Sequence, residues 1–314
     1  MKMNNFLVTG CAGFIGSHAV DLLLSHGHKV CGVDKLTYAG NIDNLDTSLA
    51  NENFTFYQSD ICDRSYIEKL INTYKTDCII NFAAESHVDN SIKGSDSFIF
   101  SNIIGVKELL EICKNRDIKF CQISTDEVYG SITTGSFSES DVLSPKNYYS
   151  ATKAAAEHIV TAYHNTFNID YLIVRMSNNY GPRQHGEKFL PTIVNSINNN
   201  KRIPLYGKGD NIRDWIYVKD SVRIIYNLIM REIYNDIYNI SFNDERKNID
   251  VIRAVLEYFN LDFDSSVEFV DDRLGHDFRY SIDNNKMSSL VRFKPTSFQD
   301  GLEQTIDFYN KRYE

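Results

Sequence analysis

Short β-branched or aromatic runs alternate with amphipathic stretches through the first half of the chain, and this alternation limits the fold more than any other feature. The runs lie at residues 6–8, 29–33, 54–58, 78–82, 120–124 and 171–175. The stretch between two of them, residues 63–74, carries Ile67, Leu70 and Ile71 at helical spacing. Because strand and helix alternate about six times, we predict an α/β fold with a doubly wound parallel sheet, right-handed crossovers and helices on both faces.

The second half of the chain has a different pattern of apolar and helical segments. Short apolar runs at residues 203–205, 215–218, 237–240 and 267–270 are mixed with helical patterns at 190–198, 221–230, 249–259 and 300–309. This mixture predicts a second, smaller mixed α/β domain. We therefore expect one domain over residues 1–175 and another over 176–314, with some helices of the second returning to pack on the first.

A glycine triplet, Gly10, Gly13 and Gly16, follows the first predicted strand and opens a helical stretch. Glycine suits this place because the turn is tight, the backbone must approach a pyrophosphate closely, and the helix must lie near the strand. The next strand ends at Asp34, whose carboxylate would accept hydrogen bonds from ribose hydroxyls and repel a 2′-phosphate. Together these features predict a Rossmann-type domain that binds NAD in preference to NADP.

Asp60 and Ile61 follow the third predicted strand, where the edge of an adenine ring could be held. An aspartate here has a second use, because either Asp60 or Asp63 would cap the helix that follows. Both interpretations stay open on the sequence alone.

Tyr149 and Lys153 stand at the start of another helical stretch, in the sequence Y-S-A-T-K. A spacing of four places both side chains on one helical face. An ammonium group beside a phenol lowers the pKa of the phenol, which gives a base that works near neutrality. The pair gains its specificity from the glycine loop in the same domain, and together they predict a base that faces the nicotinamide.

The chain is similar throughout to the extended short-chain dehydrogenases/reductases, and within that superfamily it closely resembles the nucleotide-sugar 4,6-dehydratases. Such coverage is far more specific than the glycine loop alone. The matching stretches are T-G-C-A-G-F-I-G (9–16), V-D-K-L-T-Y-A-G-N (33–41), A-A-E-S-H-V-D (83–89), S-T-D-E-V-Y-G (124–130), Y-S-A-T-K (149–153), S-N-N-Y-G-P (177–182), E-K-F-L-P (187–191), Y-G-K-G-D-N-I-R-D-W (206–215) and D-R-L-G-H-D-F-R-Y (272–280).

Two adjacent acids, Asp126 and Glu127, follow Thr125 at the C-terminal end of a predicted parallel strand, where open α/β sheets place their ligands. Two carboxyl groups there can act on two atoms of one substrate, one as acid and the other as base. The resemblance implies that Tyr149, helped by Thr125 and Lys153, removes a proton from the sugar 4-hydroxyl while C4 is oxidised. It further implies that Glu127 takes the C5 proton and Asp126 protonates the departing 6-hydroxyl. The implied product is a 4-keto-6-deoxy sugar, with bound NAD regenerated.

The same resemblance implies the rest of the site. The residues that would bind NAD, with Tyr149 and Lys153, are Gly10, Gly13, Phe14, Ile15, Gly16, Asp34, Lys35, Leu36, Thr37, Asp60, Ile61, Phe82, Ala83, Ala84, Glu85, Ser86, Ser101 and Asn179. Those that would hold the nucleotide sugar are Ser86, Thr125, Asn178, Lys188, Phe189, Pro204, Leu205, Tyr206, Arg213, Asn248, Asp272, Arg273, Leu274, Gly275 and His276. Arg213 and Arg273 suit this role because guanidinium groups match the oxygens of a diphosphate. His87 and His276 receive no catalytic role.

Two departures from the family pattern concern the site. The segment between the acid pair and Tyr149 is shorter than in many bacterial members, which would change a loop over the site. Leu274 stands where proline is usual in D-R-P-G-H, next to the nucleotide end. Thymine and uracil therefore both stay open as the base, with dTDP-glucose slightly preferred to UDP-glucose.

Composition excludes several other classes of protein. The 314 residues include 33 Lys and Arg against 42 Asp and Glu, a formal charge of −9, which argues against nucleic acid as a partner. The six cysteines form no C-x-x-C pair and there is no His cluster at ligand spacing, so we expect buried thiols and no metal site. No signal-peptide pattern and no run of 18 apolar residues is present. We expect a cytoplasmic protein without membrane contact, and the resemblance implies a homodimer.

Three alternative functions stay open. A nucleotide-sugar 4-epimerase shares the glycine loop and the Tyr/Lys pair but needs no acid and base at C5 and C6, so Asp126 and Glu127 favour the dehydratase. A dehydratase coupled to 5-epimerisation is a further possibility. A nonenzymatic NAD-binding sensor is a remote one, because such proteins can discard the catalytic tyrosine, whereas this chain retains Thr125, Tyr149 and Lys153.

Overall fold

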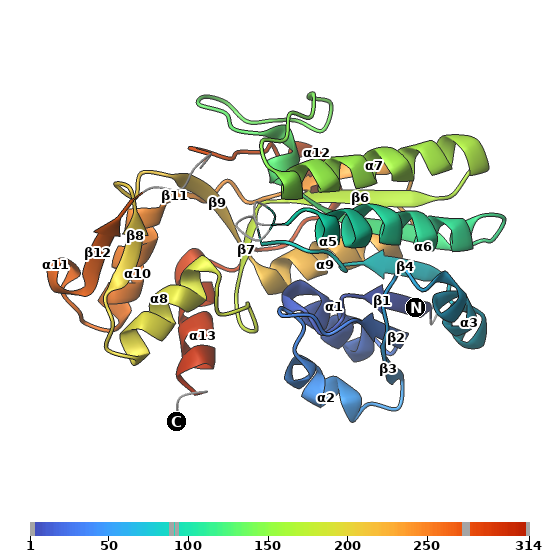
Figure 1. Cartoon of the computed structure of the whole chain (residues 1–314), viewed down its shortest axis with the longest axis horizontal. Coiled ribbons are helices and arrows are strands. Elements are labelled where there is room, and N and C mark those ends of the chain that lie inside the picture. The colour runs from blue at the N-terminus through green and yellow to red at the C-terminus, as the bar shows by residue number, and fades with distance from the viewer. Residues whose placement is uncertain (1–3, 88–90, 92–93, 272–276, 312–314) are drawn as a thin grey trace.

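A parallel sheet of seven strands forms the centre of the computed structural model, which describes residues 4–87, 91, 94–271 and 277–311 (Figure 1). Its strands are β1 (Asn5–Thr9), β2 (Lys29–Asp34), β3 (Phe54–Gln58), β4 (Cys78–Asn81), β5 (Lys119–Thr125), β6 (Tyr171–Met176) and β10 (Asp236–Ile240). Their order across the sheet is β10-β6-β5-β4-β1-β2-β3, and each neighbouring pair is parallel. Between β1 and β4 the winding of the chain reverses, and such a reversal is where open α/β sheets bind ligands.

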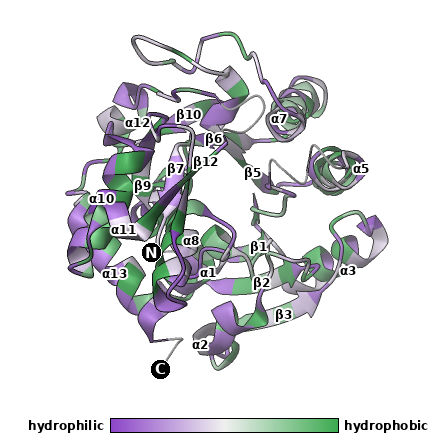
Figure 2. Ribbon diagram, turned by 60° about the vertical axis from the view of Figure 1, so that its left-hand side comes forward, coloured by the Kyte–Doolittle hydropathy of each residue, from purple (hydrophilic) through white to green (hydrophobic). Residues whose placement is uncertain are grey.

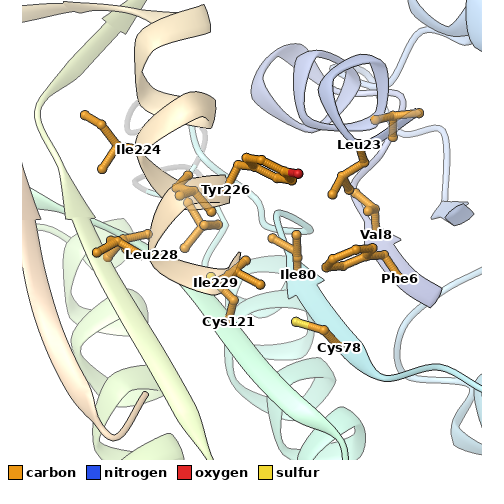
Figure 3. Packing of buried hydrophobic residues seen from close by; sticks show 14 of the residues in the cluster. Phe6, Val8, Leu23, Cys78, Ile80, Cys121, Ile224, Tyr226, Leu228 and Ile229 are labelled. Atoms are coloured by element: carbon orange, nitrogen blue, oxygen red, sulfur yellow. The ribbon is translucent and has the colours of Figure 1, made fainter. Parts of the chain in front are cut away.

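Helices cover both faces of the sheet, as the alternation predicts. One face is covered by α1 (Phe14–Ser25), α9 (Val218–Met230) and α12 (Asn285–Leu290). The other is covered by α3 (Arg64–Tyr74), α6 (Gly105–Cys113) and α7 (Tyr148–Phe167). Along β1 the side chains alternate: Phe6 and Val8 join the first core, where Figure 3 shows them near Leu23 and Tyr226, and Leu7 joins the second. The predicted doubly wound α/β fold is therefore confirmed.

A smaller mixed body lies beside the carboxyl end of the sheet, on the left of Figure 1. Its core includes Trp215, Tyr180 and Phe298, and the hydrophobic residues in green alternate with hydrophilic ones along its helices (Figure 2). Its strands are β7 (Asn178–Tyr180), β9 (Ile212–Tyr217) and β11 (Glu245–Lys247) in one sheet and β8 (Ile203–Tyr206) and β12 (Val267–Val270) in another. Its helices are α8 (Phe189–Asn198), α10 (Asn248–Tyr258), α11 (Phe263–Ser266) and α13 (Phe298–Asn310).

The two bodies do not correspond to the two halves of the sequence. The seventh strand of the large sheet, β10, comes from the second half of the sequence and pairs with β6, while α9 packs on α1. The division into domains between residues 175 and 176 stays a prediction. Three elements that follow residue 176 in the sequence, α9, β10 and α12, belong in space to the large sheet and its helices. Short helical segments complete the fold: η1 (Ile42–Leu45), α2 (Asp46–Leu49), α5 (Asp96–Ile99), the π-helical η2 (Phe100–Ile104) and η3 (Asp126–Tyr129). Within the described ranges, none of the helices has the length and apolar character needed to cross a membrane.

A buried ion pair attaches α7 to the sheet. Arg175 of β6 and Glu157 of α7 lie 2.6 Å apart, Nη2 to Oε2, with their side chains 4% and 2% exposed. Ser124 of β5 also donates to Glu157, and Arg175 donates to the hydroxyl of Tyr129 at 2.6 Å. Buried charges persist when they are paired and hydrogen-bonded in this way. The network holds α7, and with it Tyr149, against the end of β5.

Candidate active site

A cavity of about 540 Å³ lies at the carboxyl end of the large sheet. It is bounded by the segments that follow β1 to β6, by the start of α7 and by the segment that precedes α8. The five predicted catalytic residues line it together: Thr125, Asp126, Glu127, Tyr149 and Lys153. The acid pair therefore faces the same space as the Tyr/Lys pair and the glycine loop.

The glycine loop forms one wall of the cavity and is closely packed. Gly10 has a φ of +65°, and a Cβ there would lie 2.6 Å from the backbone nitrogen of Ala83. A Cβ on Gly16 would lie 2.1 Å from the carbonyl oxygen of Gly10. No side chain fits at either position, so the loop presents backbone to the cavity at the N-terminus of α1, as a pyrophosphate requires.

Asp34, at the end of β2, is buried next to this loop and lines the cavity. Its Oδ2 accepts from the N–H of Ala12 at 3.0 Å, and its Oδ1 accepts from the N–H of Leu36 at 2.8 Å. Burial raises the pKa of this carboxyl, and the backbone donors oppose the rise. Asp34 thus holds the glycine loop while presenting an acid to the cavity, where the ribose hydroxyls of a dinucleotide would lie.

The structure shows which of the two aspartates caps α3. Asp63 caps α3 by accepting from the N–H of Tyr66 at 3.1 Å. Asp60 instead accepts from the N–H of Cys62 at 2.9 Å and pairs with Lys35 at 2.6 Å. Both Asp60 and Ile61 line the cavity. The ion pair also means that the positive charge of Lys35 is balanced rather than left facing a 2′-phosphate.

The acid pair opens η3 directly after β5. Thr125 caps this turn, its Oγ1 accepting from the N–H of Glu127 at 3.3 Å and donating to Asp126 Oδ1 at 3.2 Å. Asp126 is 4% exposed, and its Oδ2 has no hydrogen-bond partner among the described residues. Glu127 Oε2 accepts from the side-chain amide of Asn147 at 3.2 Å. The two carboxyl groups therefore have different surroundings: one has a bare oxygen, and the other is held by a donor.

These surroundings act on the pKa values of both acids. Burial, with the neighbouring Glu127 and Asp214, raises the pKa of Asp126 to about 8. Burial also raises the pKa of Glu127, but the Asn147 amide and the positive charge of Arg213 lower it in turn. The raised pKa of Asp126 suits an acid, and the donors around Glu127 favour the carboxylate that a base needs.

The Tyr/Lys pair differs from the expectation in one respect. Burial raises the pKa of Tyr149, and a hydrogen bond with Thr125 is what opposes the rise. Lys153 points its ammonium group at the carbonyl oxygen of Ile123, to which it donates, and burial lowers its pKa to about 8. The predicted lowering of the phenol pKa is therefore not seen in the protein alone, where desolvation raises this pKa.

Comparison with known proteins agrees with this geometry. The family model of GDP-mannose 4,6 dehydratase matches residues 7–305. The chain belongs to the nucleotide-sugar 4,6-dehydratases. It is an NAD-dependent hydro-lyase of the extended short-chain dehydrogenase/reductase superfamily, as the sequence motifs indicated.

Individual relatives cover almost the whole dehydratase. A low-salt glycan biosynthesis protein, Agl12 of Haloferax volcanii, is 44% identical over 96% of this chain and 97% of its own. A dTDP-glucose 4,6-dehydratase of Xanthomonas campestris pv. campestris is 37% identical over 98% and 93%. The structure of DesIV, a dTDP-glucose 4,6-dehydratase from Streptomyces venezuelae with NAD and TYD bound, matches with a TM-score of 0.94 and 39% identity over 98% and 97%. UDP-sugar 4-epimerases also share the fold, at 28% to 29% identity.

The cofactor residues predicted for the dehydratase gather around the cavity. Every residue predicted to bind NAD lines it except Leu36, whose N–H donates to Asp34 instead. The close-packed glycines, the acid at the end of β2 and the size of the cavity fit a dinucleotide. Among the described residues no group of three or more His, Cys, Asp or Glu could hold a metal ion.

The predicted substrate residues of the dehydratase divide into three groups. Four of them, Ser86, Thr125, Asn178 and Lys188, line the cavity, and Lys188 reaches across it to donate to the carbonyl oxygen of Ser86 at 3.2 Å. Residues 272–276 lie outside the described part of the chain. The others belong to the smaller body and do not line this cavity: Phe189, Pro204, Leu205, Tyr206, Arg213 and Asn248. The side chain of Leu205 is buried in the core of that body, so only its backbone is free to meet a ligand.

Arg213 has an unexpected position in the dehydratase. It is 8% exposed and donates to the carbonyl oxygens of Asp277 at 2.9 Å and Phe278 at 3.2 Å. Its guanidinium group lies 4.5 Å from the ring centre of Tyr280. Arg213 therefore holds the segment directly after residues 272–276 and lowers the pKa values of both acids from behind.

Residues 131–146, between η3 and α7, pack away from the dehydratase cavity. Within this segment, Phe137 donates its N–H to Ser281 at 3.0 Å and accepts from the N–H of Asp283 at 2.7 Å. None of residues 131–146 lines the cavity, and Figure 1 shows this green loop above α7. The expectation that its length changes a loop over the site is therefore not met.

Several residues that line the cavity escaped the sequence analysis. Gly40 is one: a Cβ there would lie 2.7 Å from Asp34 Oδ1, and its place in the matching stretch 33–41 was the available signal. Gln184 and His185 carried no such signal, because they follow the motif that ends at residue 182. The residues missed are Val33, Ala39, Gly40, Ser59, Cys62, Ser97, Phe100, Ile123, Ser124, Met176, Ser177, Gln184 and His185.

Proposed function

We propose that this enzyme removes water from a nucleoside-diphosphate glucose, dTDP-glucose in preference to UDP-glucose, to give the 4-keto-6-deoxy sugar. One observation supports this most strongly: a buried carboxyl with a raised pKa, Asp126, stands beside a donor-held carboxyl, Glu127, in the cavity that Tyr149 also lines. A 4-epimerase needs neither acid. A bound NAD, held by the glycine loop and Asp34, would supply the acceptor and later the donor of the hydride.

Tyr149 takes the proton of the 4-hydroxyl in the oxidation step. The hydrogen bond with Thr125 lowers the pKa of Tyr149, and in this proposal the positive charge of Lys153 also stabilises the phenolate that the step requires. Lys153 is held by the carbonyl oxygen of Ile123, so its ammonium group stays within the buried site. The product of the step is a 4-ketone, which makes the neighbouring C5 proton acidic.

Glu127 and Asp126 carry out the elimination. Glu127 accepts the proton from C5, and the electron pair of that bond forms the C5–C6 double bond as the C6–oxygen bond breaks. Asp126 gives its proton to the departing 6-hydroxyl, which leaves as water. When C6 regains a hydride, a proton returns to C5, and the atoms of one water molecule are all that the sugar has lost.

Basic side chains hold the diphosphate in this proposal. Lys188 lines the cavity, and Arg213 supplies positive charge from the smaller body. Arg273, Asp272 and the other residues of 272–276 would complete the nucleotide end. A protein with a formal charge of −9 can thereby bind an anion locally.

The test is to incubate the purified enzyme with dTDP-glucose and UDP-glucose separately and to measure product mass. We expect loss of one water from at least one of them, faster with dTDP-glucose. Glu127→Gln should still form NADH on mixing but lose the 4-keto-6-deoxy product by about 10²- to 10⁴-fold, because C5 loses its base. Full dehydration by this variant would remove Glu127 from its role.

We also propose that the enzyme is a cytoplasmic homodimer. All six cysteines are free thiols, five of them buried, which suits a reducing compartment. Ile99 and Ile104 are exposed at 42% and 37% on the helical stretch formed by α5, η2 and α6, which packs beside α7. Exposed apolar side chains on neighbouring helices favour pairing with a second copy across these helices.

A further inference from the structure

Asn147 lies directly behind the acid pair and is not among the residues that line the cavity. Its Nδ2 donates to Glu127 Oε2 at 3.2 Å. Its Oδ1 accepts from the N–H of Ser150 at 2.8 Å and so caps α7. One side chain therefore joins the proposed C5 base to the helix that carries Tyr149 and Lys153.

The cap decides which way the amide of Asn147 is turned. The backbone N–H of Ser150 can only donate, so it requires the amide oxygen of Asn147. The hydroxyl of Ser150 accepts in return from the N–H of Asn147 at 3.3 Å, which completes a capping box. With its oxygen engaged, Asn147 has only its NH₂ group to offer Glu127, and an NH₂ group pairs best with the ionised carboxylate.

The surroundings of Glu127 make this single donor important. Burial raises the pKa of Glu127, and Asn147 is the strongest of the groups that lower it, ahead of Arg213 and Lys188. A base must be ionised before it accepts a proton. The charged and titratable groups around Glu127 come from several elements and are Asp126, Tyr149, Lys188, Arg213, Asp277 and Tyr280.

We propose that Asn147 is a positioning residue for the elimination step, which orients the Glu127 carboxylate and links it to the first turn of α7. The inference rests on the proposed function, in which Glu127 takes the C5 proton. It predicts that the oxidation at C4 and the elimination at C5 respond differently to the loss of this side chain.

Asn147→Ser removes the hydrogen bond to Glu127 and keeps the one that caps α7, because serine has a capping oxygen but no NH₂ group. We expect this variant to form NADH on mixing at the wild-type rate and to dehydrate about ten- to a hundredfold more slowly, the scale of a lost hydrogen bond to a charged group. The acidic limb of its dehydration pH profile should move to higher pH, since Glu127 then holds its proton more tightly. Deuterium uptake at C5 from heavy water should slow in parallel.

Two further variants make the test decisive. Ser297→Ala removes the cap of α13, far from the cavity, and should lower stability without changing the pH profile. A double-mutant cycle of Asn147→Ser with Glu127→Ala, followed by chemical unfolding without substrate, should give a coupling free energy different from zero.

Each outcome has a separate meaning. A wild-type dehydration rate and pH profile in Asn147→Ser would overturn the proposal, as would zero coupling in the unfolding cycle. A wild-type enzyme that leaves both nucleotide sugars unchanged would overturn the proposed function instead, and the cycle would still decide whether the contact exists.

Discussion

At the scale of single residues, the site separates two chemically similar acids by their neighbours. Asp126 is enclosed, and its Oδ2 meets no hydrogen-bond partner within the described part of the chain, whereas Glu127, one residue later, receives a hydrogen bond from an amide. The adjacent positions follow from the sequence, but their different surroundings do not, because the amide that holds Glu127 comes from Asn147, beyond the next loop of the chain. The same holds for Tyr149, because the Y-S-A-T-K motif does not reveal the desolvation that raises its pKa.

The burial of Asp126 predicts a cost in stability that depends on pH. Its pKa is about 8 in the folded protein against 3.8 for the free side chain, so between these values the folded state binds more protons than the unfolded state. Wild-type stability should therefore fall as pH rises from about 4 to about 8, by at most about 1.4 kcal/mol per pH unit from this group. Asp126→Asn lacks this titration and should become progressively more stable than wild type over that range.

Chemical unfolding of both proteins at several pH values measures the difference. Glu303→Gln, which changes an exposed carboxylate on α13, serves as the control. Its free energy of unfolding should change with pH in the same way as that of wild type. A constant difference between Asp126→Asn and wild type from pH 5 to pH 8 would contradict the assignment of the raised pKa to Asp126.

At the scale of elements, the glycine loop depends on its close packing against the backbone after β4 as much as on the backbone conformation that glycine allows. In Gly10→Ala, the new methyl group would meet the backbone after β4, at a positive φ that alanine rarely adopts. We expect the variant to lose about 1–3 kcal/mol of stability and most of its bound NAD. Unfolding curves and the NAD content of the purified protein measure the two effects.

Gly27→Ala is the matched control for this loop. Gly27 has a similar φ of +77°, but a Cβ there meets nothing within 4 Å. The Gly27→Ala variant should lose about 1 kcal/mol of stability and keep its bound NAD. Equal NAD content in the two variants would show that the contact between the loop and the backbone after β4 does not shape the site.

The strands of the first half were predictable because each is a short apolar run between turns. Predicted run 54–58 coincides with β3, and run 171–175 is one residue shorter than β6. The run at 237–240 was also recognised, but its partner was not, since a parallel pairing across about 60 residues leaves no local pattern. The cap of α3 is Asp63. Asp60 pairs instead with Lys35, which follows a different strand, so the local sequence does not reveal that Asp60 is already engaged.

At the scale of the whole molecule, the proposed dimer is the feature most open to a direct test. Ile99→Glu combined with Ile104→Glu places two charges on the exposed apolar stretch before α6. Sedimentation should then change from twice 36.1 kDa to a single chain. Leu261→Glu, exposed at 43% on the smaller body, is the control and should remain a dimer. A wild-type chain that sediments as a monomer would refute the homodimer.

The return of β10 to the edge of β6 has a consequence for how this enzyme is made. A nascent chain that has emerged only as far as residue 200 exposes the unpaired edge of β6, a hazard for wrong strand association. That edge stays open until β10 leaves the ribosome, by which time β7, β8 and β9 have also been synthesised. Truncation near residue 176 would thus yield an aggregating fragment rather than a cofactor module, and the two bodies are expected to acquire their structure as one cooperative unit.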